Sequence, residues 1–144
     1  GDWVAAQQLA DKVPHTAYTY WPSPGTAGNF QYLSDSFTMP TNGQTPEGAK
    51  CWLKVTGSAE GQKAFNTKKG SIPARSDAVP GDYPKYQQVA MADWKKDKIV
   101  PSCAHGAACT LGQNNDILSA ISQFSASPEV AKLQSAFGTA MKKS

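Results

Sequence analysis

Apolar side chains recur at helical spacing through the second half of the chain. Thr45, Pro46 and Glu47 form a helix start, because a hydroxyl cap, a proline at the first turn and an early acidic residue all favour that end. Ala49, Trp52, Leu53 and Thr56 then follow at i, i+3, i+4 and i+7. The pattern predicts one helix from there to Gly57 and a second helix that Ser58 caps, ending near Phe65 before a loop over residues 66–75.

Three more helices are predicted towards the end of the chain. The first begins at a capping Asp82 and carries Tyr83, Tyr86, Ala90 and Trp94 on one face. The second covers residues 114–124, and the third starts at Ser127-Pro128-Glu129 and ends at Lys142 and Lys143. Trp52 and Trp94 lie on the apolar faces of their helices, so we expect both to be core residues.

The first part of the chain has a different pattern. Residues 3–12 predict a short helix that Pro14 ends. Residues 15–21 alternate loosely and predict a strand or extended chain, and residues 29–39 predict one or two strands with a kink near 34–36. Two or three strands cannot build a well-covered sheet alone, so these strands need partners that the chain does not supply. We therefore divide the chain into a strand-containing part, 1–45, and a mainly helical part, 46–144.

Composition and charge exclude several classes of protein. The chain has 144 residues, room for about one domain, and only 17% of them are charged, which argues against a long disordered tail. The net charge is +3 and the basic residues are scattered, so no nucleic-acid partner is expected. The opening Gly1-Asp2-Trp3 has no signal-peptide pattern, which favours a cut chain or a piece of a longer one.

The chain contains three cysteines, an odd number. Cys103 and Cys109 lie in a Gly- and Ala-rich loop with five residues between them, where a local disulfide can close. Cys51 lies in a helical pattern and is expected to be a buried thiol that acts as a small hydrophobe. The alternative is a metal site of Cys103, His105 and Cys109, but this offers three ligands at a spacing that matches no standard zinc motif. A disulfide is the preferred interpretation, and it implies an oxidising compartment.

A series of short motifs resembles one protein family. They are Ser34–Pro40 (SDSFTMP), Glu47–Lys54 (EGAKCWLK), Gly57–Asn66 (GSAEGQKAFN), Lys69–Arg75 (KGSIPAR) and Ala104–Gly106 (AHG). In this order and spacing, with Gly1-Asp2-Trp3 ahead of them, they resemble the C-terminal part of bacterial sugar-binding proteins of ABC transporters, the glucose-type branch of the family 1 extracellular solute-binding proteins. The two cysteines that flank His105 are a departure from what the family leads us to expect.

The resemblance implies an α/β, periplasmic-binding-protein-like fold of type II with two lobes, of which this chain is a C-terminal, mostly helical fragment. The protein would bind a monosaccharide, glucose by the resemblance, between lobes that close by a hinge. It would deliver the sugar to the membrane permease of the transporter, without a cofactor or metal ion. Its location would be the periplasm or the extracellular face, with a lipid anchor in a Gram-positive cell. The N-terminal remainder of the same protein would supply the first lobe.

The resemblance also assigns three sugar-binding residues, one on each of three motifs: Asp35, Lys69 and His105. Their chemistry suits a hexose, because a carboxylate accepts two hydroxyl protons, an ammonium donates to hydroxyl or ring oxygens, and a neutral imidazole adds one donor or acceptor. Without the resemblance each has a plainer interpretation: Asp35 as a turn residue, Lys69 as a solvated charge and His105 as an ordinary loop residue.

Two other classes of function remain as alternatives. A hydrolytic enzyme built on His105, Asp35 and a Cys or Ser is disfavoured, because the chain has no nucleophile-elbow motif and no HExxH. A small secreted helical interaction module, stapled by Cys103 and Cys109, explains the cysteines and the helices but not the series of motifs.

Overall fold

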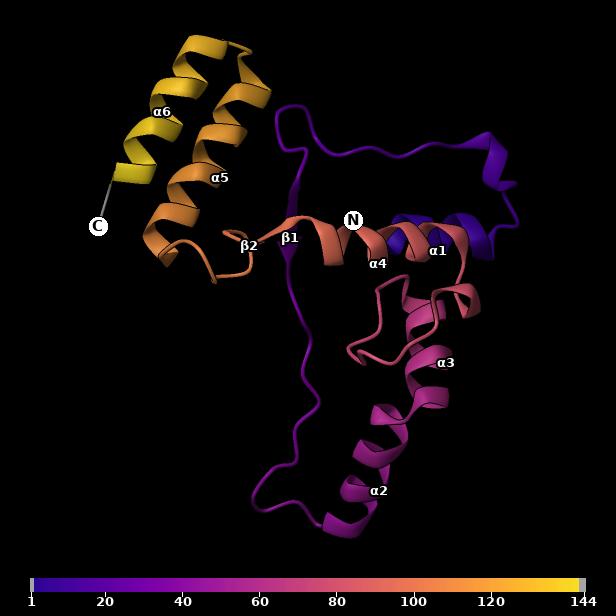
Figure 1. The fold of residues 1–144 in the computed structure, drawn as a ribbon. Coiled ribbons are helices and arrows are strands. Elements are labelled where there is room, and N and C mark those ends of the chain that lie inside the picture. Colours follow the sequence, from indigo (N-terminus) through magenta and orange to yellow (C-terminus); the bar gives the residue numbers. More distant parts are fainter. Residues whose placement is uncertain (1, 143–144) are drawn as a thin grey trace. The chain divides into compact units, whose positions relative to one another are not determined.

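The structure, a computed structural model, describes residues 2–142. Gly1 of the opening Gly1-Asp2-Trp3 and Lys143 of the predicted last helix lie outside this range. Helices joined by long irregular stretches make up most of the described residues, which also contain one two-stranded sheet (Figure 1). The elements in chain order are α1 (Asp2–Ala10), η1 (His15–Ala17), β1 (Asn29–Tyr32), α2 (Pro46–Gly57), α3 (Ala59–Lys69), η2 (Pro80–Asp82), α4 (Lys85–Lys96), β2 (Lys98–Pro101), α5 (Leu111–Ala126) and α6 (Val130–Lys142), where η marks a short 3-10 helix.

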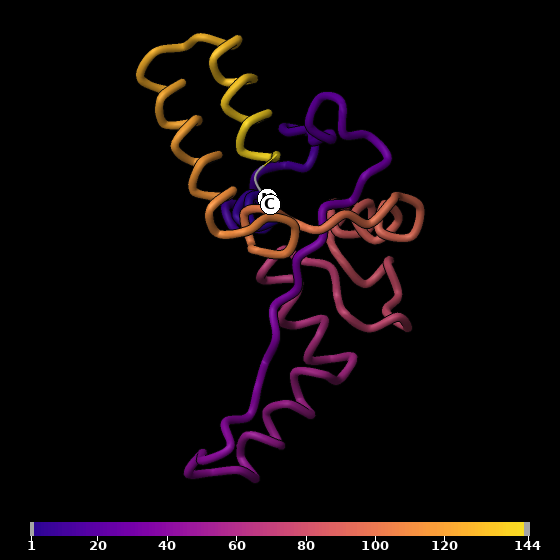
Figure 2. The backbone as a smooth tube through the Cα atoms, turned by 90° about the vertical axis from the view of Figure 1, so that its left-hand side faces the viewer, coloured from indigo at the N-terminus to yellow at the C-terminus, as the bar shows by residue number. Residues whose placement is uncertain are grey.

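The chain divides into two units. Unit 1 comprises the residues up to Phe30 together with Asp35–Lys98, and unit 2 comprises Gln31–Ser34 together with the chain from Ile99 onward. In unit 1, α3 packs against both α1 and α2. The extended stretch over residues 35–44 runs alongside α2 and α3, as both views of the backbone show (Figures 1 and 2). In unit 2, α5 and α6 form a helical hairpin.

Local capping signals place several helix starts. Helix α2 begins at Pro46 as predicted, although the Thr45 side chain makes no capping hydrogen bond. Helix α3 begins after Ser58, whose hydroxyl accepts a hydrogen bond from the Gly61 N–H at 3.0 Å, so this predicted cap is confirmed. Helix α5 begins at Leu111, three residues before the predicted start at Asn114. The reason is a capping box, in which Thr110 and Gln113 each accept a hydrogen bond from the other's backbone N–H.

Two predicted helix boundaries are wrong. Helix α3 does not end at Phe65 but continues to Lys69, where Gly70 takes a left-handed conformation, with φ of 90°, and closes the helix. The next helix does not start at Asp82, which belongs to the 3-10 turn η2. It starts at Lys85, directly after Pro84, because a proline inside the helix would remove a backbone hydrogen bond.

The strands differ most from the prediction. Residues 15–21 form the turn η1 and irregular chain rather than a strand, and the predicted strand over 29–39 is limited to Asn29–Tyr32. Its partner β2 is a strand that the sequence did not predict. A strand persists only where a neighbour accepts its ladder of hydrogen bonds. Residues 15–21 have no such neighbour within the described chain, whereas β1 has β2.

Few apolar side chains are buried. The buried hydrophobic residues are Tyr83, Ala90, Met91, Ala120 and Ala140. Trp52 and Trp94, which were expected in the core, are 55% and 36% exposed, and the Cys51 thiol is exposed rather than buried. The predictions for the two tryptophans are wrong because their aromatic neighbours, Phe37 for Trp52 and Phe30 for Trp94, cover only part of each side chain. Among the helices of residues 2–142, none has the length and apolar character that crossing a membrane requires.

Candidate functional site

Asp35 and Lys69, two of the three predicted sugar-binding residues, form an ion pair in unit 1. Asp35 lies in the extended stretch after β1, and Lys69 is the last residue of α3. The position of Lys69 is favourable, because the carbonyl groups at a helix C-terminus carry partial negative charge. The side chains of Asp35 and Lys69 are 58% and 39% exposed, so both ends of the pair can reach a ligand.

Aromatic packing holds the Asp35 segment against the two helices. The Phe37 ring meets Trp52 of α2 edge to face at 6.1 Å between ring centroids, and Phe65 of α3 at 5.5 Å. The Lys69 ammonium in turn lies 5.7 Å from the centroid of the Phe65 ring, within the range of a cation–π contact. The ion pair therefore lies beside a cluster of three partly exposed aromatic rings, and Phe37 fixes the extended stretch two residues after Asp35.

Buried amides fix the chain immediately after Lys69. Gln87 of α4 is only 2% exposed, and its Nε2 donates to the carbonyl oxygens of Asn66, at 2.9 Å, and Ser71, at 2.6 Å. The Ser71 hydroxyl donates to Oδ1 of Asn66 at 2.6 Å. Gly70 lies between Asn66 and Ser71 in the sequence. The Asp2 carbonyl oxygen is 2.5 Å from the position that a Cβ on Gly70 would take. This close approach of α1 explains why a glycine is required after Lys69.

Arg75 fixes the other end of the Lys69–Arg75 motif. Its guanidinium donates to the carbonyl oxygen of Gly57 at 3.0 Å and to the carboxylate of Asp77, with Nε 2.8 Å from Oδ1. The hydrogen bond from Arg75 lowers the pKa of Asp77, and the same bond raises the pKa of Arg75. Gly57 is the last residue of α2, so the hydrogen bond from Arg75 connects the loop after α3 to the end of α2. Arg75 therefore supports the loop that Lys69 opens.

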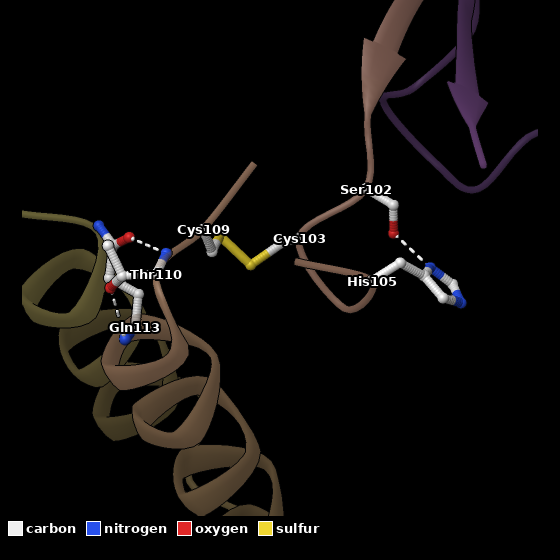
Figure 3. The surroundings of a disulfide bond; sticks show 6 residues. All are labelled: Ser102, Cys103, His105, Cys109, Thr110 and Gln113. Atoms are coloured by element: carbon white, nitrogen blue, oxygen red, sulfur yellow. Dashed lines mark hydrogen bonds between the residues drawn. A yellow bond between two sulfur atoms is a disulfide. The ribbon is translucent and has the colours of Figure 1, made fainter. Parts of the chain in front are cut away.

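His105, the third predicted residue, lies in unit 2 in a loop that a disulfide between Cys103 and Cys109 closes (Figure 3). The His105 side chain is exposed, and its Nδ1 lies 2.7 Å from Oγ of Ser102. The backbone N–H groups of Ala107 and Ala108 both donate to the Ser102 carbonyl oxygen, at 3.0 and 3.2 Å. The loop thus has a fixed path, and it presents the imidazole at its surface.

The disulfide bears directly on the metal-site alternative. With both sulfurs in a disulfide, Cys103 and Cys109 cannot supply the thiolates that a site with His105 would need. Over residues 2–142, no group of three or more His, Cys, Asp or Glu side chains is placed to hold a metal ion. The exposed Cys51 is a free cysteine.

The predicted residues do not line either of two hollows in the described chain. One hollow, of about 250 Å³, lies in unit 1 against α1, η1 and α4. The other, of about 180 Å³, lies in unit 2 between α5 and α6. Asp35, Lys69 and His105 contribute to neither of them. They stand on exposed surface instead, Asp35 and Lys69 together in unit 1 and His105 in unit 2.

Two residues with clear structural roles were missed from the sequence. Gln87 was assigned no role, yet it holds the backbone beside Lys69, and only its burial in the fold reveals this. Ser102 was also passed over. Its signal was present in the sequence, because a serine three residues before a histidine in a tight loop is well placed to hydrogen-bond that ring. Together these residues determine how the candidate side chains are held.

Comparison with known proteins gives a consistent result. The chain is 34% identical over 99% of its length to an ABC transporter extracellular-binding protein of Pyrococcus horikoshii, and 34% identical over 76% of its length to a xylose/arabinose-binding protein of Haloferax volcanii. It is 37% identical over 67% of its length to a probable sugar-binding periplasmic protein of Mesorhizobium japonicum. The chain is similar to extracellular solute-binding proteins of ABC transporters. No protein-family model matches it.

The similarity covers part of each relative. The aligned residues span 33%, 25% and 24% of the length of these three proteins, and the alignment that includes 99% of the chain covers about a third of the relative. All three relatives are named for binding, and none for catalysis. The expected resemblance to sugar-binding proteins of ABC transporters is confirmed at this level, and the helices and small sheet of the fold are compatible with part of such a protein.

Proposed function

We propose that this chain is the C-terminal part of an extracellular solute-binding protein that captures a monosaccharide for an ABC transporter. The similarity over 99% of the chain to an ABC transporter extracellular-binding protein carries this proposal. The protein binds its sugar without transforming it and passes it to a membrane permease. It acts in the periplasm or at the extracellular face, and the disulfide of the His105 loop supports this location because such bonds persist in oxidising compartments.

Asp35, Lys69 and His105 are the sugar-binding residues in this proposal. The Asp35 carboxylate accepts hydrogen bonds from two hydroxyl groups, and the Lys69 ammonium donates to hydroxyl or ring oxygens. The ion pair between them keeps both groups at one place before the sugar arrives. Sugar hydroxyls then take over part of the bonding between the two charges, which is possible because both side chains are substantially exposed.

Closure of two lobes around the sugar provides the signal to the permease. A ligand that contacts both lobes binds the closed form more tightly and shifts the population towards it. The present chain supplies residues to such a site, and the remainder of the protein supplies the other lobe. This accounts for three candidate residues on exposed surface rather than in an enclosed cavity.

The sugar that we propose is glucose, on the strength of the five motifs that resemble the glucose-type branch. The relative from Haloferax volcanii is named for xylose and arabinose, so these pentoses are the most informative competitors. Glucose carries a hydroxymethyl group that xylose lacks. A site that hydrogen-bonds this group is left with an unpaired polar partner when xylose binds, and this selects against the pentose.

Calorimetric titration of the full-length protein that contains these residues tests the proposal. D-glucose, D-xylose and L-arabinose are titrated into the wild type and into Asp35→Asn and His105→Ala variants. We expect both substitutions to weaken binding by more than about tenfold, because a hydrogen bond to a charged group contributes about 1.5–3 kcal/mol. Binding of a pentose in preference to glucose would replace glucose as the ligand while leaving the function intact.

The matched control is Glu129→Gln, which removes another exposed carboxylate that pairs with a lysine, Lys132 of α6. This control should bind sugar as the wild type does. If the wild type binds sugar and the Asp35 and His105 variants bind it equally well, the assignment of the site is wrong. If the wild type binds none of the three sugars, the proposed monosaccharide function is wrong.

A further inference from the structure

Ser102 is placed to control the chemistry of His105. It follows β2 directly and is only 2% exposed, although the loop that it begins is mostly exposed. Its Oγ lies 2.7 Å from Nδ1 of His105. Figure 3 shows Nδ1 turned towards Ser102, while the opposite edge of the ring, with Nε2, points away from it. One ring nitrogen of His105 is therefore occupied, and the other is available to a ligand.

The hydrogen-bonding requirements of the Ser102 hydroxyl and the His105 imidazole determine which ring nitrogen carries the proton. A hydroxyl has one proton to donate, and a neutral imidazole has one N–H and one bare nitrogen. Among residues 2–142, the contact with His105 is the single hydrogen bond that Ser102 Oγ makes. If Nδ1 carried the proton, the buried hydroxyl proton would have no acceptor, and buried polar groups are rarely left in that state. Ser102 must then donate to a bare Nδ1, and the ring proton resides on Nε2.

The loop is built to maintain this contact. The Ser102 carbonyl oxygen accepts from the N–H groups of Ala107 and Ala108, and the Cys103 carbonyl oxygen accepts from Gly106 at 3.0 Å. The disulfide between Cys103 and Cys109 closes the same loop, and Gly106 supplies the left-handed conformation, with φ of 74°, that its tight path requires. These constraints keep the backbone of His105 at a fixed distance from Ser102.

We propose that Ser102 is a positioning residue that holds His105 as the Nε2–H tautomer, so that His105 offers a hydrogen-bond donor to the bound sugar. The inference rests on the proposed function and specifies one part of it. The partner of Nε2–H is a sugar oxygen that acts as acceptor, either a hydroxyl lone pair or the ring oxygen. In this arrangement Asp35 accepts hydrogen bonds from the sugar, and Lys69 and His105 donate hydrogen bonds to it.

The tautomer is measured by ¹⁵N NMR of the imidazole nitrogens at a pH where the ring is neutral. In the wild-type chain, Nε2 of His105 should be protonated and Nδ1 bare, in a single form. His15 serves as the reference in the same spectrum, because its ring makes no hydrogen bond to the residues that the structure describes and is free to sample both tautomers. Protonated Nδ1 in the wild-type chain would overturn the proposal without any variant being needed.

Three variants separate positioning from simple structural support. In Ser102→Ala, the His105 signals should change to the mixed pattern of His15, whereas Ser102→Thr, which keeps the hydroxyl, should restore the single tautomer. The control is Ser125→Ala on α5 of the same unit, whose hydroxyl donates to the Ile121 carbonyl oxygen. It should leave His105 unchanged. A Ser102→Ala variant that keeps the wild-type pattern contradicts the proposal.

Sugar affinity in the full-length protein completes the test. If the Nε2–H tautomer of His105 falls to about half of the population, Ser102→Ala should weaken sugar binding about twofold, less than His105→Ala does. The two substitutions combined should weaken binding no more than His105→Ala alone. A wild type that binds sugar and a Ser102→Ala variant that binds it equally well overturn this inference alone. A wild type that binds no sugar overturns the proposed function, and the inference with it.

Discussion

The polar residues around Lys69 fall into two groups with different energetic roles. Asp35 and Lys69 are exposed, and pairs of exposed charges contribute only about 0–1 kcal/mol to stability because water screens them. Gln87 is buried, so a loss of its hydrogen bonds leaves the Ser71 carbonyl oxygen without the donor that Gln87 supplies. Substitutions of the charged pair should therefore affect ligand binding, whereas substitutions of Gln87 should affect folding.

Substitution of Gln87 by leucine, a side chain of similar size, should lower the free energy of unfolding by about 1–3 kcal/mol. The Asn66 carbonyl keeps the Gly70 N–H as a donor at 2.8 Å, but the Ser71 carbonyl loses the hydrogen bond from Gln87. Urea unfolding measures the change. The control is Gln123→Leu at an exposed position on α5, where a change within about 0.5 kcal/mol is expected. Equal stability of Gln87→Leu and wild type would contradict this account of Gln87.

Tyr86 makes stability depend on pH in the alkaline range. Its hydroxyl donates to the carboxylate of Asp2, and burial together with this hydrogen bond raises the pKa of Tyr86 well above its ordinary value of 10.0. A group whose pKa is raised by folding contributes stability that is fully present below its unfolded pKa. That contribution is lost as the pH rises from about 10 towards the folded pKa, with a slope of up to about 1.4 kcal/mol per pH unit.

Chemical unfolding at pH 9 to 11 compares the wild type with Tyr86→Phe. The phenylalanine has no proton to lose, so the stability of the variant should fall less steeply above pH 10. Tyr18→Phe leaves the bond between Tyr86 and Asp2 in place, and it should keep the wild-type slope. Parallel curves for wild type and Tyr86→Phe would show that Tyr86 does not carry this dependence.

Helices and strands differ in how much of each could be predicted from the sequence. Six helices are expected in about their observed places, because caps, prolines and apolar spacing are local signals. The predicted boundaries are wrong where one local signal outweighs another. At Pro84, for example, the proline moves the start of α4 to Lys85, although Asp82 is a suitable capping residue. The strand β2 was missed because its pairing with β1 joins segments that are more than sixty residues apart. No local pattern carries that information.

The end of α3 depends on Gly70. Gly70→Ala should lower the free energy of unfolding by about 1–3 kcal/mol, because an alanine at φ of 90° is strained. The added Cβ would also lie 2.5 Å from the Asp2 carbonyl oxygen and 2.9 Å from Cβ of Ala6, so α1 would have to move. Thermal unfolding measures the loss.

Gly81→Ala is the matched control for Gly70→Ala. Gly81 lies in η2, its φ is not in the left-handed region, and the position of an added Cβ has no atom within 4 Å. We expect this variant to unfold at about the wild-type temperature. If both substitutions had the same effect, neither the conformation of Gly70 nor its closeness to α1 would be the reason for the glycine.

At the scale of the whole molecule, the candidate site could be predicted only through the family resemblance. Asp35 and Lys69 are 34 positions apart, and folding brings them into contact. Composition and periodicity gave Asp35 the plainer interpretation of a turn residue, and the motifs SDSFTMP and KGSIPAR gave both residues a common role. The family motifs do not predict a role for Ser102, because that role depends on the burial of its side chain and on its hydrogen bond with His105.

Much apolar surface remains uncovered in the described residues, and this leads to a last prediction. Among residues 2–142, twenty large hydrophobic side chains are at least 36% exposed, including Trp3, Trp21, Trp52, Leu111 and Leu118. The relatives are about three times as long as this chain. Under the proposed function, the remaining polypeptide covers these side chains, since exposed apolar surface of this extent marks an interaction site. The 144-residue chain alone should therefore bind the dye ANS strongly, and the full-length protein should not.

Fluorescence titration with ANS at equal molar concentrations measures the difference. The control is the 144-residue chain in concentrated urea, which solvates the apolar groups and should abolish the signal. Strong ANS fluorescence from the short chain alone would support a cover that the rest of the protein supplies. If the full-length protein bound as much dye as the short chain, its additional residues would leave these side chains exposed, and they would then be available to a partner such as the permease.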